Sequence, residues 1–194
     1  MVENATNQPL VKPQEQLITP RLTIRPLQDT DASAFFGFYS DADTMKYMSR
    51  PAFTDMNQAR RLVNERLQYC AQGNGVCWVL ELTEGEVVVG SIDLFKIEAE
   101  SKRAEIGYVL AKMVWGQGIM TEAMNAVIRH SFNQLQLNRL EADIDPENDA
   151  SARLLKKCGF HLEGLLKQRW IVAGKVTDSE IYGLVAEDWS PPDS

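Results

Sequence analysis

Hydrophobic residues in the first part of the chain follow a spacing of two and then a spacing of three and four. Residues 17–27 alternate between apolar and polar side chains, which predicts an edge strand. Residues 29–39 and 54–70 place apolar side chains at helical spacing behind a residue suited to cap a helix, so two helices are expected there. The polar stretch between them, residues 40–53, predicts a loop.

The spacing returns to two in the middle of the chain, which predicts a three-strand meander over residues 76–82, 87–95 and 104–110 with a hairpin turn at Glu84–Gly85. Four further elements follow, and they are a helix over 120–135, a strand over 140–144, a helix over 148–158 ended by Gly159, and a hairpin over 168–173 and 176–185. This order predicts a mixed α/β, or α+β, sheet flanked by helices. It lacks the regular alternation of a doubly wound nucleotide-binding fold.

Length and composition fit one domain. With 194 residues, of which 44% are hydrophobic, the chain can bury a core without disulfides or metals. Residues 1–16 are polar and contain Pro9 and Pro13, so a flexible N-terminal arm is expected there. A single domain over 17–189 and a short tail over 190–194 would follow.

Charge and cysteine content argue against several classes of protein. The net charge is -7 and no run of Lys or Arg occurs, which argues against nucleic acid as a partner. A cationic acceptor such as an amine is compatible with this charge, although ordinary solubility explains it equally well. The three cysteines form no Cys-x-x-Cys pair, so neither a disulfide framework nor a zinc site is expected.

Signals for targeting and for metals are also missing. The first residues have neither the basic nor the apolar region of a signal peptide, and no apolar run approaches the ~18 residues of a membrane span. His130 and His161 stand alone, without a Ser or Cys partner in a triad-like context. We therefore expect a cytoplasmic protein with no membrane partner and no metal.

Residues 113–121 place two glycines between a strand and a helix. Gly116 and Gly118 lack Cβ, so their backbone can approach a ligand closely. The N–H groups of the first helical turn have no partner inside the helix, and together with the helix dipole they attract a phosphate. The segment is neither a Walker sequence nor a full GxGxxG, so a simple tight turn is an equal alternative.

Three motifs taken together resemble a known family. The order AEIGYVL (104–110), WGQGIMTEA (115–123) and NDASARLLKKCGF (148–160) is similar to the acetyl-CoA-binding core of the GNAT acetyltransferases. The opening TPRLTIRPLQDTD and the closing GKVTDSEIYGL resemble the Rim-type branch, which contains the ribosomal-protein alanine and serine N-terminal acetyltransferases. The resemblance spans residues 17–189 and implies a mostly antiparallel twisted sheet whose central strands splay apart to hold CoA.

The resemblance also implies which residues bind acetyl-CoA. The glycine turn would hold the diphosphate, the strand edge would bind the pantetheine arm, and a backbone N–H of that edge would polarise the thioester carbonyl. The implied cofactor-binding residues are Tyr108, Val109, Leu110, Trp115, Gly116, Gln117, Gly118, Ile119, Met120, Thr121, Asn148 and Ser151. The chain departs from the family pattern at Met120, where a small residue is usual.

Acetyl transfer to an amine needs a proton for the departing thiolate. Many members of the family take it from a Tyr on the helix after the fifth strand, but Leu155 stands at the matching position here. The resemblance to the Rim branch implies that Ser151 is the catalytic proton donor, a role typically worth about 10²–10⁴-fold in rate. Support of the first helical turn is the alternative role for Ser151.

The base that removes the amine proton is less constrained. Glu105 lies on the strand before the glycine turn, at a position that resembles the general base of several family members. Glu141, Asp143 and Asp145 share the polar face of the next strand and are alternatives, as is an ion-paired role for each. Water could also serve, because an α-amine with a pKa near 7.8 is about 15% neutral at pH 7.

The resemblance implies an acceptor that enters between the early helices and the final hairpin. We expect the N-terminal α-amine of a protein of the ribosomal type. Alternatives are a small amine, such as a polyamine, an aminoglycoside or an amino acid, and a non-catalytic acyl-CoA-binding module. A homodimer is compatible with the sequence. The candidate substrate-binding residues, whose aromatic members suit the core at least as well, are Tyr39, Tyr47, Trp78, Asp143 and Trp170.

Overall fold

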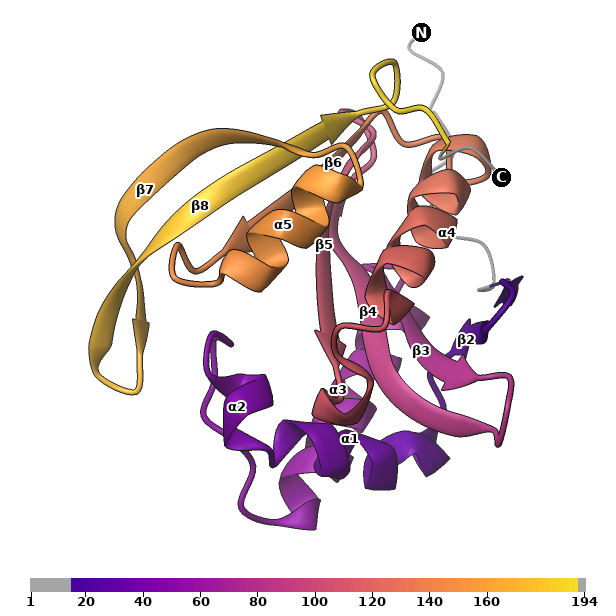
Figure 1. Cartoon of the computed structure of the whole chain (residues 1–194), viewed down its shortest axis with the longest axis vertical. Coiled ribbons are helices and arrows are strands. Elements are labelled where there is room, and N and C mark those ends of the chain that lie inside the picture. Colours follow the sequence, from indigo (N-terminus) through magenta and orange to yellow (C-terminus); the bar gives the residue numbers. More distant parts are fainter. Residues whose placement is uncertain (1–14, 192–194) are drawn as a thin grey trace, which may run out of the picture.

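The computed structural model describes residues 15–191, so most of the predicted arm and tail lies outside the described residues. Within this range, eight strands form one twisted sheet in the order β1-β2-β3-β4-β5-β6-β8-β7 (Figure 1). Neighbouring strands run antiparallel except for β5 and β6, which run parallel. The predicted mixed, mostly antiparallel sheet is confirmed.

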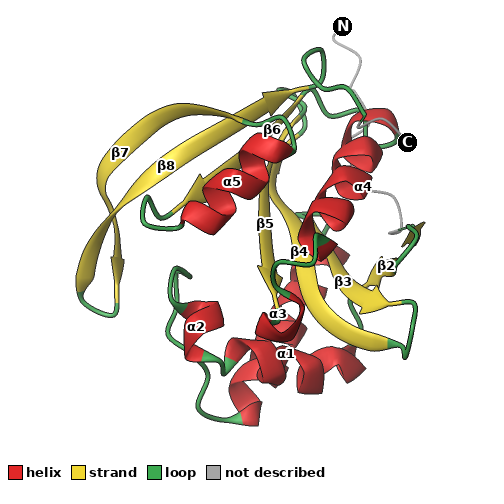
Figure 2. Ribbon diagram, viewed as in Figure 1, coloured by secondary structure: helices red, strands yellow, loops and turns green. Residues whose placement is uncertain are grey.

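The strands are β1 (Leu17–Ile18), β2 (Leu22–Pro26), β3 (Val76–Leu82), β4 (Val87–Glu98), β5 (Arg103–Leu110), β6 (Arg139–Ile144), β7 (His161–Val172) and β8 (Lys175–Val185). The helices are α1 (Ala32–Tyr39), α2 (Ala42–Met45), α3 (Met56–Ala71), α4 (Ile119–Asn133) and α5 (Asp149–Lys157). Figure 2 shows how these helices lie against the sheet.

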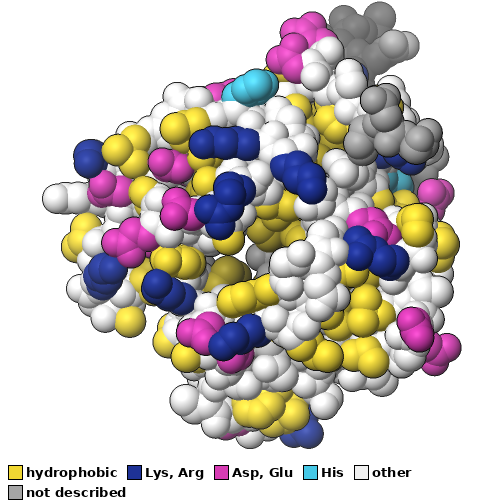
Figure 3. All heavy atoms as spheres, in the orientation of Figure 1, with side chains coloured by type: hydrophobic (Ala, Val, Ile, Leu, Met, Phe, Trp, Pro, Cys, Tyr) yellow, Lys and Arg dark blue, Asp and Glu magenta, His cyan; other side chains and the backbone are white. Residues whose placement is uncertain are grey.

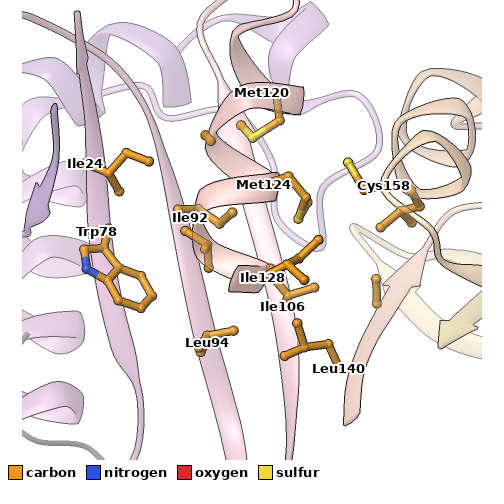
Figure 4. Close-up of a cluster of buried hydrophobic side chains, with 14 of the residues drawn as sticks. Ile24, Trp78, Ile92, Leu94, Ile106, Met120, Met124, Ile128, Leu140 and Cys158 are labelled. Atoms are coloured by element: carbon orange, nitrogen blue, oxygen red, sulfur yellow. The ribbon is translucent and has the colours of Figure 1, made fainter. Parts of the chain in front are cut away.

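Helices cover both faces of the sheet, and the period-two alternation of the strands supplies a core layer to each face. Val76, Trp78 and Leu80 of β3 belong to the layer packed with α4 and α5. Cys77 and Val79, between them in sequence, belong to the layer packed with α1 and α3. Figure 4 shows part of the first layer, in which side chains of α4 meet those of the central strands.

The two central strands separate part-way along their length. The parallel pairing of β5 with β6 joins only residues 103–105 to residues 139–141. Beyond Glu105, β5 continues to Leu110 in register with β4 alone. Its other edge has no strand partner in the described chain, and such an edge can hydrogen-bond an extended ligand. The splayed arrangement that the family resemblance implied is therefore present.

Three elements differ from the sequence-based expectation. Residues 17–27, predicted as one edge strand, form β1 and β2, which pair antiparallel with each other. The segment predicted as a loop contains α2, because Asp41 caps it: the Asp41 Oδ1 accepts a hydrogen bond from the Thr44 N–H at 2.7 Å. The first strand of the final hairpin begins at His161 rather than at residue 168. Its side chains are almost all exposed, so no alternation of apolar and polar residues marks it in the sequence.

Candidate functional site

One cavity, of about 630 Å³, lies between α2, the N-terminal end of α4 and the first turns of α5. It is lined by residues 108–110 of β5, by the glycine turn 115–121 apart from Gln117, and by Asn148 and Ser151. On this face, Figure 3 shows a hollow with hydrophobic side chains inside and Lys and Arg side chains around it. A cavity of this volume is large enough for a cofactor-sized ligand.

The glycine turn presents backbone N–H groups to this cavity. Gly116 and Gly118 have φ angles of +74° and +76°, in the left-handed region that favours glycine. Gly118 is the N-cap of α4, and its carbonyl accepts the first helical hydrogen bond, from the Glu122 N–H at 3.1 Å. The N–H groups of residues 116–121 donate to no acceptor in the described chain. They can therefore bind an anion such as a diphosphate at the positive end of the helix dipole.

Two side chains hold this turn in place. The indole N–H of Trp115 donates to the Leu110 carbonyl at 2.8 Å, which ties the turn to the end of β5. Arg21 donates from Nη1 to the Gln117 carbonyl at 2.8 Å, and its Nε pairs with Glu122 at 2.6 Å. Gln117 was expected to bind the cofactor, but it does not line the cavity. The anchoring role of Arg21 was not predicted, because 96 residues separate it from Gln117.

The start of α5 lies at the cavity wall. The Oδ1 of Asn148 caps the helix by accepting a hydrogen bond from the Ser151 N–H at 3.1 Å. This cap uses the backbone of Ser151 and leaves its hydroxyl out of the capping interaction. Leu155, one turn further along, is fully buried in the core layer packed with α4. The position where many family members carry a catalytic Tyr therefore has a structural role in this chain.

Tyr108 contributes a second hydroxyl to this part of the wall. Its side chain lines the cavity, while its oxygen is covered by protein and has no hydrogen-bond partner of ordinary geometry in the described chain. Burial raises the pKa of the Tyr108 phenol above its usual value, and the neighbouring Ser151 hydroxyl opposes this rise without cancelling it. The phenol is therefore neutral at physiological pH.

The predicted base Glu105 lies outside the cavity wall. Both oxygens of its carboxylate accept hydrogen bonds from Lys96 Nζ at 2.9 Å. Asp145, one of the alternatives, accepts a hydrogen bond from the Glu147 N–H at 2.8 Å. The geometry therefore does not bring either carboxylate to a position that faces Ser151 across the cavity.

The two acidic residues of β6 form ion pairs with arginines. Glu141 lies between Arg103 and Arg139, with N–O distances of 2.6 and 2.8 Å. Burial alone would raise the pKa of Glu141, but the hydrogen bonds from the two arginines outweigh it and hold the pKa below its usual value. Asp143 pairs with Arg169 at 3.0 Å. The Glu141 carboxylate therefore remains charged and is a poor proton acceptor.

Tyr39 and Trp78 were expected as walls of the acceptor pocket, and this prediction was wrong. Both side chains are buried in the core, and neither lines the cavity. The Tyr39 hydroxyl accepts a hydrogen bond from Arg66 Nη2 at 2.7 Å on the α3 side of the sheet. The Trp78 indole N–H donates to the Glu15 carbonyl at 3.1 Å, and its ring meets His130 edge-on. Alternation along β3 places Trp78 in the core layer packed with α4 and α5.

The other three predicted acceptor residues lie in two places. Tyr47, which follows α2, lines the cavity, and the Lys46 ammonium lies 4.7 Å from the centre of its ring. Asp143 and Trp170 lie together on β6 and β7, where the indole N–H donates to the carboxylate at 3.3 Å. They do not line the cavity. A role for these two in binding the acceptor therefore stays a prediction.

Part of the cavity wall comes from residues that the sequence did not single out. Arg153 and Lys157 are four residues apart on α5, so they share the helix face that borders the cavity. This spacing was a usable signal. No comparable signal marked the segment around α2, which was expected to be a loop. The lining residues missed are Asp43, Thr44, Lys46, Met48, Val114, Ala150, Arg153, Leu154 and Lys157.

Residues 15–191 contain neither a cluster of metal-ligating side chains nor a helix suited to span a membrane. In this part of the chain no three His, Cys, Asp or Glu side chains come close enough together to hold a metal ion. None of its helices is both long enough and apolar enough to cross a membrane.

Similarities to known proteins agree with this geometry. Residues 21–161 match the family described as an acetyltransferase (GNAT) domain. The chain is 34% identical over 176 residues to an uncharacterized N-acetyltransferase, p20, of Bacillus licheniformis, and the match covers 91% of this chain and 99% of that protein. It is 27% identical over 187 residues to the ribosomal protein uS5-alanine N-acetyltransferase of Escherichia coli, covering 92% and 95% of the two chains.

The fold is similar to that of solved acetyltransferases. The crystal structure of a GNAT-family acetyltransferase from Bacillus anthracis superposes with a TM-score of 0.79 at 28% identity. The superposition covers 89% of this chain and 99% of that one. The similarity therefore extends over most of the fold, and not over one motif alone.

Proposed function

The chain belongs to the GNAT family of N-acetyltransferases, and from that premise we propose that its acceptor is the N-terminal α-amine of a protein. The enzyme transfers an acetyl group from acetyl-CoA to an amine, as members of its family do. Similarity to the uS5-alanine N-acetyltransferase supports a ribosomal protein as the acceptor, and hence action in the cytoplasm. The observation that carries the proposal is the charge of the cavity wall.

The cavity wall contains almost no negative charge. Asp43 is the acidic residue among the lining side chains, and it is paired with Lys112 at 2.5 Å. Lys46, Arg153 and Lys157 line the same cavity and are basic. A polyamine or an aminoglycoside carries several positive charges, which need negative charges nearby to compensate them. The basic side chains of this wall would repel such an acceptor. A single α-amine carries at most one positive charge and needs no such compensation.

The ion-paired carboxylates near the site also favour an α-amine as the acceptor. Glu105 and the acidic residues of β6 are ion-paired, so the cavity lacks a free strong base. An α-amine with a pKa near 7.8 is about 15% neutral at pH 7, whereas a Lys-like amine near 10.4 is about 0.04% neutral. The α-amine can therefore react after losing its proton to water, and we propose this route for the deprotonation step.

The proposal gives each part of the site a task. Acetyl-CoA supplies the thioester, and the free N–H groups of residue 116 and residues 118–121 hold its diphosphate. The unpaired edge of β5 at residues 108–110 binds the pantetheine arm, and the N–H of Leu110, which faces this edge, polarises the carbonyl. Ser151 gives its hydroxyl proton to the departing thiolate sulfur.

The acceptor is tested by measuring thiol release from acetyl-CoA with a panel of amines. The panel holds peptides that begin with Ala, Ser or Met, the same peptides with blocked N-termini, spermidine and an aminoglycoside. We expect release with the free peptides and only background with their blocked counterparts. Release with spermidine or the aminoglycoside alone would move the acceptor to the small-amine class. Confirmed acetyl-CoA binding with no release from a panel that includes ribosomal-protein N-terminal peptides would favour a non-catalytic binding module.

The proton donor is tested by Ser151→Ala, with Ser33→Ala as a control because Ser33 is an exposed serine on α1. We expect kcat to fall by about 10²-fold or more in Ser151→Ala, with the Kd for acetyl-CoA unchanged. The control should behave as the unmodified enzyme. A loss of less than tenfold in Ser151→Ala would show that the thiolate is protonated by another group.

A further inference from the structure

Tyr108 brings a buried hydroxyl to the cavity wall beside Ser151. Its oxygen is covered by protein and has no hydrogen-bond partner of ordinary geometry in the described chain. A buried hydroxyl without a partner destabilises a fold relative to Phe, so its presence in a packed wall requires an explanation. Ser151 is near enough to influence the ionisation of the phenol, and both residues line the same cavity.

We propose that Tyr108 is a positioning residue for Ser151. The phenol O–H of Tyr108 donates a hydrogen bond to the Ser151 oxygen while acetyl transfer takes place. This inference rests on the proposed role of Ser151 as the proton donor. A serine hydroxyl has one proton and rotates about its C–O bond. When its oxygen accepts a hydrogen bond from one side, that proton is directed to the other side, toward the thioester sulfur.

The step balances without any further reactant. The amine nitrogen attacks the thioester carbonyl, the new C–N bond forms, and the C–S bond breaks with its electron pair leaving on sulfur. The sulfur takes the Ser151 proton, and the proton released by the amine returns to Ser151 through water. Tyr108 keeps its own proton throughout, because it acts only as a hydrogen-bond donor.

The surroundings of the phenol fit a donor that does not ionise. Two titratable side chains influence the pKa of Tyr108, and they are Cys158 at the end of α5 and Tyr182 on β8. Burial raises the pKa of the Cys158 thiol to about 11, and it raises the pKa of Tyr182 as well. Cys158 and Tyr182 are therefore uncharged at physiological pH, and the phenol hydroxyl remains available as a donor.

The placement of Tyr108 also accounts for the absence of a tyrosine on α5. Leu155 is fully buried there and cannot serve as an acid. The hydroxyl is supplied instead from β5, which faces the first turns of α5 across the splayed strands. In this arrangement the serine is the group that touches the sulfur, and the tyrosine acts through it.

The experiment compares Tyr108→Phe with Tyr182→Phe, which removes a phenol hydroxyl that is hydrogen-bonded to Glu180 and does not line the cavity. For Tyr108→Phe we expect kcat to fall by about five- to tenfold, as the loss of one hydrogen bond predicts. The KM for acetyl-CoA should not change, and the midpoint of urea unfolding should be equal or higher, because an unpaired buried hydroxyl is removed. Tyr182→Phe should keep its kcat.

A double-mutant cycle with Ser151→Ala separates the positioning role from an independent one. If Tyr108 acts through Ser151, the double variant is no slower than Ser151→Ala alone. The ratio of kcat between the unmodified enzyme and Tyr108→Phe should also stay constant between about pH 6 and 9, because the phenol does not titrate there.

Each contrary result has a distinct meaning. Unchanged kcat in Tyr108→Phe, or losses that multiply in the double variant, would overturn the positioning role. A lower unfolding midpoint together with an unchanged kcat would make the hydroxyl structural. If Ser151→Ala loses less than tenfold in kcat, the proposal that Ser151 is the proton donor is wrong. This result differs from an unchanged kcat in Tyr108→Phe, so the failure of the Ser151 proposal can be told apart from the failure of the Tyr108 proposal.

Discussion

Replacing Gly118 by alanine tests whether the glycine turn binds the diphosphate. Gly118 is the N-cap of α4 with φ of +76°, and an added Cβ would lie 3.6 Å from Arg21 Nη2, which is an ordinary contact. The substitution therefore introduces backbone strain without a clash. An L-residue in the left-handed region costs about 1–2 kcal/mol, and the smaller entropy of the unfolded chain offsets about 0.4–1 kcal/mol of this. We expect a net loss of about 1 kcal/mol in the free energy of unfolding.

The same substitution should weaken cofactor binding. Relief of the strain rotates the peptide after Gly118 and turns its N–H away from the diphosphate. A hydrogen bond to a charged group is worth about 1.5–3 kcal/mol, so the Kd for CoA should rise by about 10- to 150-fold. Pantetheine, which lacks the diphosphate, should bind the variant as it binds the unmodified enzyme.

Calorimetric titration with CoA and with pantetheine, together with urea unfolding, measures both effects. Gly37→Ala is the matched control, because Gly37 is exposed within α1 and an added Cβ meets nothing within 4 Å. It should gain about 0.5–1 kcal/mol of stability without a change in CoA binding. A Gly118→Ala variant that loses stability but binds CoA normally would refute the reasoning, since strain would then be present without any role of the turn in binding.

Three further predictions concern groups around the site. Glu105→Gln should change kcat by less than about threefold, because the carboxylate is paired with Lys96 and lies outside the cavity wall; a tenfold loss in kcat would show that Glu105 is the base. Leu155→Ala should cost about 2–5 kcal/mol in urea unfolding, since the side chain is fully buried; a loss below about 1 kcal/mol would contradict its core role. Burial holds the pKa of His130 below 6.5, so the unfolded chain binds its proton more readily. The contribution of His130 to the free energy of unfolding should therefore be complete above pH 6.5 and fall below it by up to about 1.4 kcal/mol per pH unit. Equal pH profiles of stability for the unmodified protein and His130→Gln would exclude this contribution.

Much of the fold could be predicted because its elements have clean periodicity. The helical spacing in α4 arises from burial of one face, and the alternating residues of β3 belong to the two core layers on either side of the sheet. Gly159 ends α5 with φ of +93°, as its place after an apolar helix indicated. The element missed altogether was α2, a single turn stabilised by the Asp41 cap, and one turn is too short to show a period.

The site was predictable where it follows the chain locally and less so where it depends on packing. The glycine turn and the start of α5 are each read from adjacent residues, and both line the cavity. The ion pair between Glu105 and Lys96 and the anchoring of the turn by Arg21 join residues that are distant in sequence. The covered hydroxyl of Tyr108 depends on how the strands splay, which no local pattern records.

The central claim is that this enzyme acetylates an α-amine in preference to more basic amines. It is tested most directly by one competition, in which a peptide with a free N-terminus and an internal lysine is offered together with spermidine. Tandem mass spectrometry then locates the acetyl group after a single round of reaction with limiting acetyl-CoA. We predict acetyl on the peptide α-amine, with the lysine and the spermidine left unmodified. Acetyl on spermidine or on the lysine side chain would contradict the claim.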